Sequence, residues 1–420
     1  MLICKEEEFH YRMPRYFPRG IRFFLCLIFV SALFLSGCSS PDTEIEPMAE
    51  YGDYGSSIAQ TLASLYPYRK AYSQSEKQAG EYIKTEFEKL GYEVEEQFFW
   101  SPSQAGSSTN YIVRIEGEGL MFRDSRGNYN QEQRQVIVGA HYDTSYGVLD
   151  AGKFIDFDGI QDNACGIGCL LTLAKELRYE SMGYDVVLVA FGAASDSYAG
   201  AKAYTSKMTE EEIAAADVMY CVESIYAGDK LYANAGWNSL EPGKKYENRR
   251  KLYEVYDVVY ENRLSSKNGV DLLYNESGQS LDVDGDGSVD VFREVTTTLS
   301  DYVPFDKAGI PIVFIESYDY NYTNAADMKE TKNLKLQAYG GMIRRTNLDS
   351  VQFLEEFLPE DQLSTRINNT AFILLKAIEK GAHNSLSMTE YAEGITLAPT
   401  IRVTATPAAA GASEAASTTK

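Results

Sequence analysis

Two short stretches combine residue types that could hold a metal ion or move a proton. "VIVGAHYD" ends in His141 and Asp143, and "GIQDNACGIG" places Asp162 at the start of an apolar helical segment. Because residues i and i+2 of a strand point to the same side, Asp143 can orient the imidazole of His141. Structural interpretations also exist, since a histidine at a strand end can be a satisfied core residue and Asp162 can be an N-cap.

Acidic residues later in the chain extend this pattern. Glu223 follows the apolar stretch "MYCV", where a carboxylate is costly unless it has a partner. Asp301 and Tyr302, in "LSDYVPFDKAGIP", precede a short helix and another apolar strand. These positions are further candidates for one polar site.

The strand "VVLVAFG" ends in a loop that carries unexpected residues. A loop after a buried strand is a common position for catalytic groups in α/β proteins. Here the loop presents Ala194 and Ser195, and no acid occurs before Asp196. The loop therefore has the position of a catalytic loop without its usual side chains.

Alternating strand and helix patterns must position these residues. The strand predictions are "TNYIVRIEG", "RQVIVGAHYD", "YDVVLVAFG", "DVMYCVES" and "GIPIVFIES". Helices are predicted for "AGEYIKTEFEKL", "DNACGIGCLLTLAKELRYE" and "TRINNTAFILLKAIEKG". Buried strands interleaved with helices indicate a three-layer α/β/α sandwich. A segment at about 237–298 breaks the alternation, and we interpret it as an inserted cap.

The order of these blocks resembles the co-catalytic zinc exopeptidase family. That family includes bacterial aminopeptidases, glutamate carboxypeptidases, glutaminyl cyclases and the non-enzymatic transferrin receptor ectodomain. Its blocks "GAHYDS", "DNASG", "FGAEE.GLLGS..Y", "NLDM" and "SDH.PF..AGIP" are similar to "GAHYDT", "DNACG", "FGAASDSYAGAKAY", "CVESI" and "SDYVPFDKAGIP" here. The resemblance covers about residues 56–380 outside the insertion, and it implies a mixed central sheet flanked by helices.

The resemblance also implies roles for the retained residues. His141 matches the first histidine ligand, with Asp143 as its orienting neighbour. Asp162 matches the metal-bridging aspartate, and Glu223 stands where the family has an aspartate. These residues imply a remnant site for one zinc ion, because three protein ligands can hold zinc.

Besides Glu223, three positions depart from the family pattern. Ala194 replaces the general base, Ser195 replaces a zinc ligand, and Tyr302 stands where the last histidine is expected. His383 follows the final predicted helix in a different context and does not replace it. A second metal ion is therefore not expected, and the loss of a base alone typically costs about 10²–10⁴-fold in rate.

These departures lead to two alternative functions. We expect a catalytically impaired domain, a pseudoenzyme that binds a peptide, glycan or protein ligand. The alternative is an active exopeptidase or amidohydrolase with a single metal, using Asp196 or Glu223. Asp156, Asp158 and Asp196 could in principle reach the site, but we interpret them as solvated loop acids.

A stretch inside the insertion has the spacing of a calcium loop. Alternate oxygens followed by a glycine converge on calcium in such loops, and the residues in this pattern are Asp282, Asp284, Asp286, Ser288 and Asp290. Arg293 occupies the twelfth position, where a bidentate glutamate is usual. We predict a structural calcium site, and the alternative is an exposed Asp-Gly hairpin.

The two ends of the chain are predicted to lie outside the fold. Residues 1–37 have a basic start and a short apolar core, and they end in "LSG" before Cys38. This resembles a bacterial lipoprotein signal and implies lipid attachment at Cys38 on the extracytoplasmic face of the cell membrane; the alternative is an ordinary signal peptide or a short anchor. Residues 38–55 read as a tether, 56–383 as the domain, and 384–420, rich in Ala, Thr and Ser, as a disordered tail.

Composition excludes a nucleic-acid partner. The chain has 39 basic and 61 acidic residues, for a net charge of −22, and no basic stripe that could track phosphates. Cys165, Cys169 and Cys221 remain after signal removal, and they read as small buried residues instead of a disulfide framework.

Overall fold

The computed structural model describes residues 51–145, 157–241, 245–265, 271–276, 279–281, 290–321 and 328–397. Cys38, Asp156 and positions 282–289 of the predicted calcium loop lie outside these ranges. The first long helix, α2 (Tyr54–Leu65), begins slightly before the predicted domain start at residue 56.

An eight-stranded mixed sheet forms the centre of the fold. Its order is β1-β2-β6-β5-β7-β12-β8-β9, with the bounds β1 Glu95–Trp100, β2 Ser107–Ile115, β6 Asp185–Phe191, β5 Gln135–His141, β7 Ala216–Val222, β12 Ile312–Tyr318, β8 Lys230–Ala235 and β9 Leu272–Leu273. The four central strands β6, β5, β7 and β12 run parallel. β2 and β8 pair antiparallel with the outer strands of this group. The predicted mixed sheet is confirmed.

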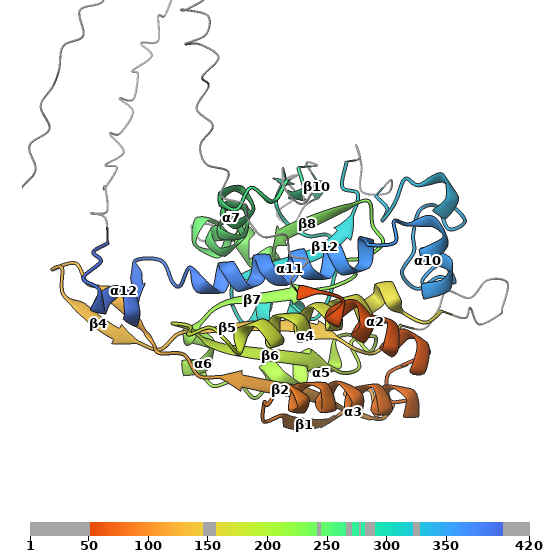
Figure 1. Cartoon of the computed structure of the whole chain (residues 1–420), viewed down its shortest axis with the longest axis horizontal. Helices are drawn as coiled ribbons and strands as arrows, with labels where there is room; N and C mark the ends of the chain where they lie inside the picture. The colour runs from red at the N-terminus through yellow and green to blue at the C-terminus, as the bar shows by residue number, and fades with distance from the viewer. Residues whose placement is uncertain are drawn as a thin grey trace, which may run out of the picture. The chain divides into compact units, whose positions relative to one another are not determined.

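Helices cover both faces of the sheet (Figure 1). One face carries α2, α3 (Gln74–Lys89), α4 (Cys165–Leu177), α7 (Lys245–Glu261) and α11 (Gln362–Glu379), and the other carries α5 (Ala199–Thr205), α6 (Glu210–Ala215) and α9 (Val303–Lys307). The strands alternate accordingly, since Tyr111 contacts α3 while its neighbour Ile112 belongs to the core on the α5 side. The structure is the predicted three-layer sandwich.

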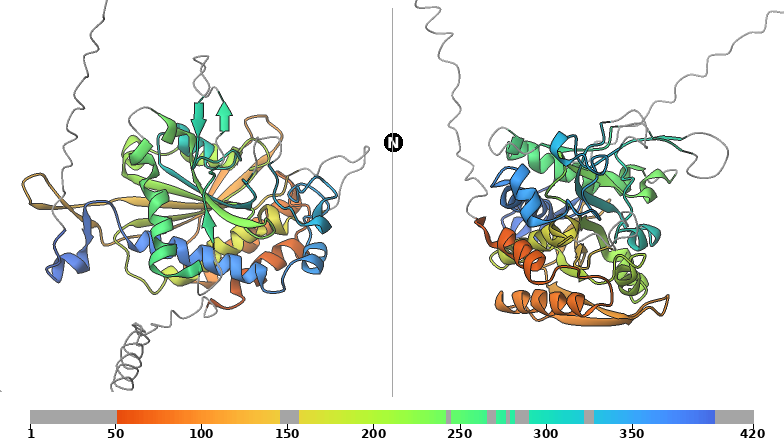
Figure 2. Two further views of the ribbon diagram at one scale, coloured as in Figure 1. Left: turned by 90° about the horizontal axis from the view of Figure 1, so that it is seen from above. Right: turned by 90° about the vertical axis from the view of Figure 1, so that its right-hand side faces the viewer.

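Much of the segment predicted as a cap is built into the sandwich. After the short turn Trp237–Leu240, α7 packs on β8, β12 and α11, with Leu252, Val255 and Val258 fully buried. The apolar face of α7 needs this partner, because an amphipathic helix gains most of its stability from packing. Among the described residues of this segment, only the antiparallel pair β10 (Gln279–Leu281) and β11 (Asp290–Phe292) forms a separate two-stranded element (Figure 2).

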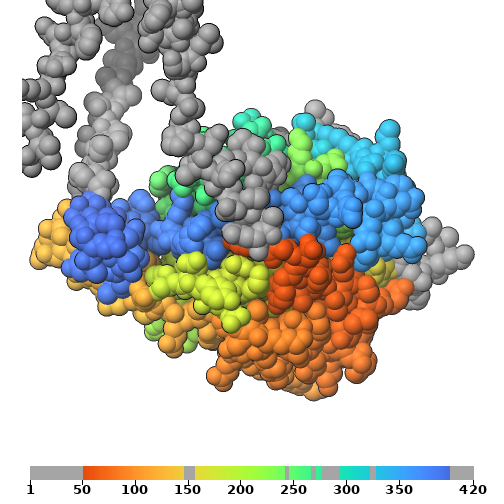
Figure 3. Space-filling view, viewed as in Figure 1, coloured from red at the N-terminus to blue at the C-terminus, as the bar shows by residue number. Residues whose placement is uncertain are grey.

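The fold continues beyond residue 383, where the sequence predicted a disordered tail. β13 (Ser385–Ser387) pairs with β3 (Leu120–Arg123), which pairs with β4 (Tyr129–Glu132), and α12 (Met388–Ala392) follows. Ser387 and Glu390 form a reciprocal capping box at the start of α12. Figure 3 shows this part of the chain packed beside β4. The prediction of disorder is wrong for residues 385–392. It was based on side-chain composition, whereas β13 is held by main-chain hydrogen bonds to β3, which require few large side chains.

Candidate active site

The candidate residues meet at one end of the parallel strands. His141 is the last residue of β5, and Glu223 directly follows β7. The loop after Phe191, at the end of β6, lies at the same edge, because parallel strands end together. This edge is the usual position of sites in open α/β sheets.

His141, Asp162 and Glu223 form a buried cluster. His141 Nε2 lies 3.2 Å from Asp162 Oδ1 and 4.0 Å from Glu223 Oε2, and one potential ligand atom of each residue lies within 4.8 Å of the others. On the other side of the ring, His141 Nδ1 is 3.0 Å from the backbone oxygen of Asp143 and 3.6 Å from its carboxylate. The structure therefore brings together the four residues that the sequence analysis assigned to the zinc site and its orientation: His141, Asp143, Asp162 and Glu223.

Hydrogen bonds of the backbone fix the position of Asp162, and its side chain does not cap the helix that follows. Asp162 lies in the turn Ile160–Ala164 that leads into α4, and the peptide bond between Asp162 and Asn163 is cis. The backbone N–H groups of Gln161 and Asp162 donate to the two oxygens of Asp349, at 2.7 and 3.2 Å. The side chain that binds the first turn of α4 is that of Asn163, whose Oδ1 accepts from the Gly166 N–H at 3.1 Å. The carboxylate of Asp162 is thus left to face the cluster.

The cluster fits one metal ion. Two atoms that bind the same zinc ion each lie about 2.0–2.2 Å from it, so the separations of 3.2 and 4.0 Å suit a single ion. Both oxygens of Asp162 are buried without a hydrogen-bond partner among the described residues. A buried carboxylate in this state is costly unless a cation compensates it.

The loop after β6 contributes backbone groups and no acid. The N–H groups of Ala194 and Ser195 donate to the Asp143 carboxylate at 2.8 and 3.0 Å. The Asp196 carboxylate is held elsewhere, because its Oδ2 accepts from the hydroxyls of Tyr72 and Ser101, both at 2.6 Å. The Asp196 carboxylate therefore does not belong to the cluster.

Asp158 is not available to the site either. Its carboxylate accepts from the backbone N–H groups of Ile160 at 3.1 Å and Val351 at 2.8 Å, the second at the start of α10 (Val351–Phe357). Asp158 thus joins two segments of the chain, and it was wrongly interpreted as a solvated loop acid.

The structure corrects the prediction for Tyr302. Its ring is buried in the core beside Phe314, with centroids 5.3 Å apart, and its hydroxyl donates to the backbone oxygen of Thr298 at 2.8 Å. An aromatic ring gains more from this burial than from facing a polar cluster. Tyr302 therefore does not stand at a ligand position.

Comparison with known proteins assigns the family. The pattern described as "Peptidase family M28" matches residues 125–346, which is more than half of the chain. The chain belongs to peptidase family M28. It is also 22% identical over 345 residues, covering 80% of this chain and 92% of the relative, to the "Alkaline phosphatase isozyme conversion protein" of Escherichia coli (strain K12).

Solved structures share the M28 fold. BSAP, a zinc aminopeptidase from Bacillus subtilis, is 14% identical with a TM-score of 0.51, covering 79% of this chain and 96% of that one. The glutaminyl cyclase of Fimbriiglobus ruber is 18% identical with a TM-score of 0.53, covering 79% and 95%. At these identities the likeness establishes the fold alone.

Two adjacent arginines, which the sequence analysis missed, complete the site of this M28 domain. Arg344 contacts three buried carboxylates, Glu223 at 3.3 Å, Glu316 at 2.9 Å and Glu330 at 3.0 Å. The Nε of Arg345 lies 3.7 Å from Asp162 Oδ2. The only signal in the sequence is a pair of basic residues in an acidic chain, and no motif links that pair to the site.

Charges in the cluster compensate one another. Burial alone would lower the pKa of His141, but the carboxylates of Asp143, Asp162 and Glu223 raise it well above its usual value. Burial would raise the pKa of Asp162, but His141 and Arg345 hold it below its usual value. Without a metal ion, the cluster is therefore a network of ion pairs.

One further acid near the cluster lacks a partner. Asp301 is fully buried, and neither of its carboxylate oxygens has a hydrogen-bond partner among the described residues. Burial raises its pKa to about 8. Asp301 is thus largely protonated at neutral pH.

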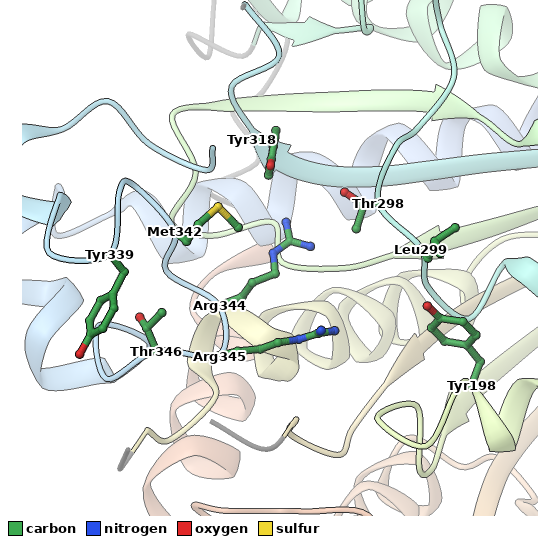
Figure 4. A pocket seen from close by; sticks show the side chains of 9 residues that line it. All are labelled: Tyr198, Thr298, Leu299, Tyr318, Tyr339, Met342, Arg344, Arg345 and Thr346. Atoms are coloured by element: carbon green, nitrogen blue, oxygen red, sulfur yellow. The ribbon is translucent and has the colours of Figure 1, made fainter. Parts of the chain in front are cut away.

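A cavity of about 690 Å³ opens beside the arginines. Arg344 and Arg345 lie on one side of it, and Tyr198 lies across from Arg345 (Figure 4). Its lining combines these polar groups with aromatic and apolar side chains: Tyr198, Thr298, Leu299, Tyr318, Tyr339, Met342, Arg344, Arg345 and Thr346. This mixture is typical of a small-molecule or peptide site.

Proposed function

We propose that this M28 domain binds a ligand at the remnant zinc site without hydrolysing it. The observation that carries the proposal is the environment of Asp143, whose carboxylate is held by the backbone of Ala194 and Ser195. In this proposal the methyl group of Ala194 replaces the acid that would take a proton from water, and the hydroxyl of Ser195 replaces a zinc ligand. Asp196, the next acid in the loop, is bound to Tyr72 and Ser101.

A single zinc ion is compatible with this function. His141, Asp162 and Glu223 would hold it. A bound zinc ion polarises carbonyl groups and lowers the pKa of water. Asp143 would orient the imidazole of His141 toward the ion. The loop after β6 offers no general base.

The ligand class follows from the cavity. Tyr198, Leu299 and Met342 provide aromatic and apolar walls, while Arg345 provides a charged group at one side. A peptide, or an exposed segment of a protein, offers both apolar side chains and polar backbone groups to such a surface. We therefore propose a peptide or protein ligand.

The location proposed for the protein rests on its N-terminal sequence. The basic and apolar stretch before Cys38 supports lipid attachment at that residue and a position on the extracytoplasmic face of the bacterial membrane. Within the described part of the chain, no helix combines the length and apolar character of a membrane span. In this proposal the domain meets its ligand outside the cytoplasm.

Turnover measurements test the proposal. We would load the metal-free protein with zinc and assay a panel of aminoacyl p-nitroanilides, with His141→Ala as the matched control. We expect the same background rate from both proteins. A site without a general base does not hydrolyse the substrate even with zinc bound, so the loss of a zinc ligand in His141→Ala should not lower the rate. Zinc-dependent turnover that disappears in His141→Ala would overturn the proposal.

A second candidate function is a hydrolase that uses one metal ion. It is favoured by the two buried oxygens of Asp162, which accept no hydrogen bond among the described residues and are suited to a cation. This candidate requires one tightly held equivalent of metal together with turnover that stops on chelation. A protein that holds metal but shows no turnover supports ligand binding instead.

A further inference from the structure

The two oxygens of Asp162 face two different positively charged groups. Oδ1 lies 3.2 Å from His141 Nε2, on the side where Glu223 completes the metal-binding cluster. Oδ2 lies 3.7 Å from Arg345 Nε. Asp162 therefore bridges one potential metal position and one guanidinium group.

Arg345 is presented to Asp162 by a well-fixed loop. Glu330 Oε2 accepts the backbone N–H groups of Ile343 at 2.6 Å and Arg344 at 2.8 Å. Arg345 itself has a φ of 64°, a left-handed conformation that is unusual for arginine. Backbone conformations of this kind persist where the surrounding structure imposes them. The loop thus fixes the backbone of Arg345 and directs its side chain from a defined position toward Asp162.

Arg344 and Arg345 play different parts in this arrangement. Arg344 is buried, and its ion pairs are with three carboxylates, those of Glu223, Glu316 and Glu330. The side chain of Arg345 is 51% exposed and borders the cavity. Its single ion-pair contact within the described part of the chain is Asp162. Arg344 is therefore structural, whereas Arg345 is the cation available to the bridging carboxylate.

We infer that Arg345 supplies the positive charge of the second metal position, so that this domain holds at most one metal ion. Two groups argue against a metal ion there: Ser195, which the family pattern assigns to that position, has only a neutral hydroxyl, and Arg345 places a fixed positive charge 3.7 Å from Asp162 Oδ2. A guanidinium group does not lose its proton in proteins and cannot act as a ligand. The bridging role of Asp162 is retained, with an arginine in place of one ion.

The inference has a consequence for the first metal position. A zinc ion bound by His141, Asp162 and Glu223 shares the Asp162 carboxylate with Arg345, and the two positive charges repel each other. Asp162 is fully buried, so the repulsion acts partly through the protein interior, although water screens part of it because half of the Arg345 side chain is exposed. Arg345 should therefore weaken zinc binding, and a neutral side chain at this position should strengthen it.

Calorimetric zinc titration of the metal-free protein tests this inference. The wild type should bind no more than one equivalent, and Arg345→Gln should bind zinc at least tenfold more tightly. Arg345→Lys keeps the charge and should bind zinc as the wild type does. Arg126→Gln, an exposed arginine in the turn between β3 and β4, is the matched control and should change nothing.

Two further comparisons assign the measured binding to this site. His141→Ala in the Arg345→Gln background should abolish the gain in affinity. The thermal unfolding midpoint of each variant shows whether it is folded. Two bound equivalents in the wild type, or equal affinity in wild type, Arg345→Gln and Arg345→Lys, would overturn the inference. Zinc-dependent peptide turnover would instead contradict the proposed function and leave this inference standing.

Discussion

Arg344 illustrates how a single side chain can hold a site together. Its guanidinium group contacts carboxylates that come from three separate parts of the chain, namely the end of β7, the strand β12 and the loop that contains Glu330. Buried acids of this kind are costly unless they are paired. Arg344 therefore stabilises the fold mainly because it neutralises three buried negative charges at once, and less because of any single ion pair.

Replacing Arg344 should destabilise the domain strongly. Arg344→Met keeps much of the volume but leaves Glu223, Glu316 and Glu330 without their common cation, and we expect a loss of about 3–5 kcal/mol. Urea unfolding followed by circular dichroism measures this loss. The exposed Arg126→Met should stay within about 0.5 kcal/mol of the wild type. Equal stability of the two variants would show that the acids are protonated or hydrated.

At the scale of elements, the short helix α9 is joined to the turn Trp237–Leu240 by one aspartate. Asp306 Oδ1 accepts from the backbone N–H of Asn238 at 3.0 Å. Burial raises the pKa of Asp306 to about 6. The carboxyl group therefore binds a proton more tightly in the folded chain than in the unfolded chain.

This shift predicts a pH dependence of stability. A raised carboxyl pKa favours the folded state fully below about pH 4, and this contribution is lost as the pH rises through about 6. Asp306→Asn keeps the accepting oxygen and cannot ionise. Its stability relative to the wild type should therefore rise by about 1–2 kcal/mol between pH 4 and pH 7. Chemical unfolding at a series of pH values checks this, and a constant difference would contradict it.

The strands β10 and β11 flank the predicted calcium loop. The loop positions 282–289 lie outside the described residues, and Asp290 begins β11. We propose a structural calcium ion there, because closely spaced acids repel one another without a cation.

Calcium should therefore raise the thermal unfolding midpoint of the protein. Millimolar calcium suffices for a weak extracellular site, and Asp284→Asn with Asp286→Asn should remove the effect. Differential scanning calorimetry with calcium, with magnesium and with chelator makes the comparison. A midpoint that does not respond to calcium, or responds equally in the double variant, would favour the exposed hairpin.

For the whole molecule, the proposed lipid anchor decides where the domain works. Cys38→Ser removes the only thiol at the proposed attachment point, and it should move the protein from the membrane fraction to the soluble periplasmic or secreted fraction. Metabolic labelling with a fatty-acid analogue should mark the wild type and not the variant. Labelling of both proteins, or membrane retention of the variant, would contradict the lipoprotein prediction and favour an anchor that keeps its apolar segment.

Local patterns in the sequence were sufficient for the sheet, its helical layers and the convergence of His141, Asp162 and Glu223. Each of these residues lies at the end of an apolar strand or at the start of an apolar helix. The ends of parallel strands meet at one edge of the sheet whatever the details of side-chain packing. The absence of an acid at positions 194 and 195 was equally visible, because it depends on residue identity alone. The calcium loop and Cys38 remain predictions.

Only the tertiary structure decided which distant side chains reach the site. Tyr302 is buried in the core, and Asp196 is bound to Tyr72 and Ser101, although both lie within motifs that pointed to the site. Arg345 contacts Asp162 from a loop far along the chain and belongs to no recognised motif. Whether a side chain reaches the site depends on how the helices and strands pack and on the conformation of the loops. Both are determined by contacts between residues that are far apart in the sequence.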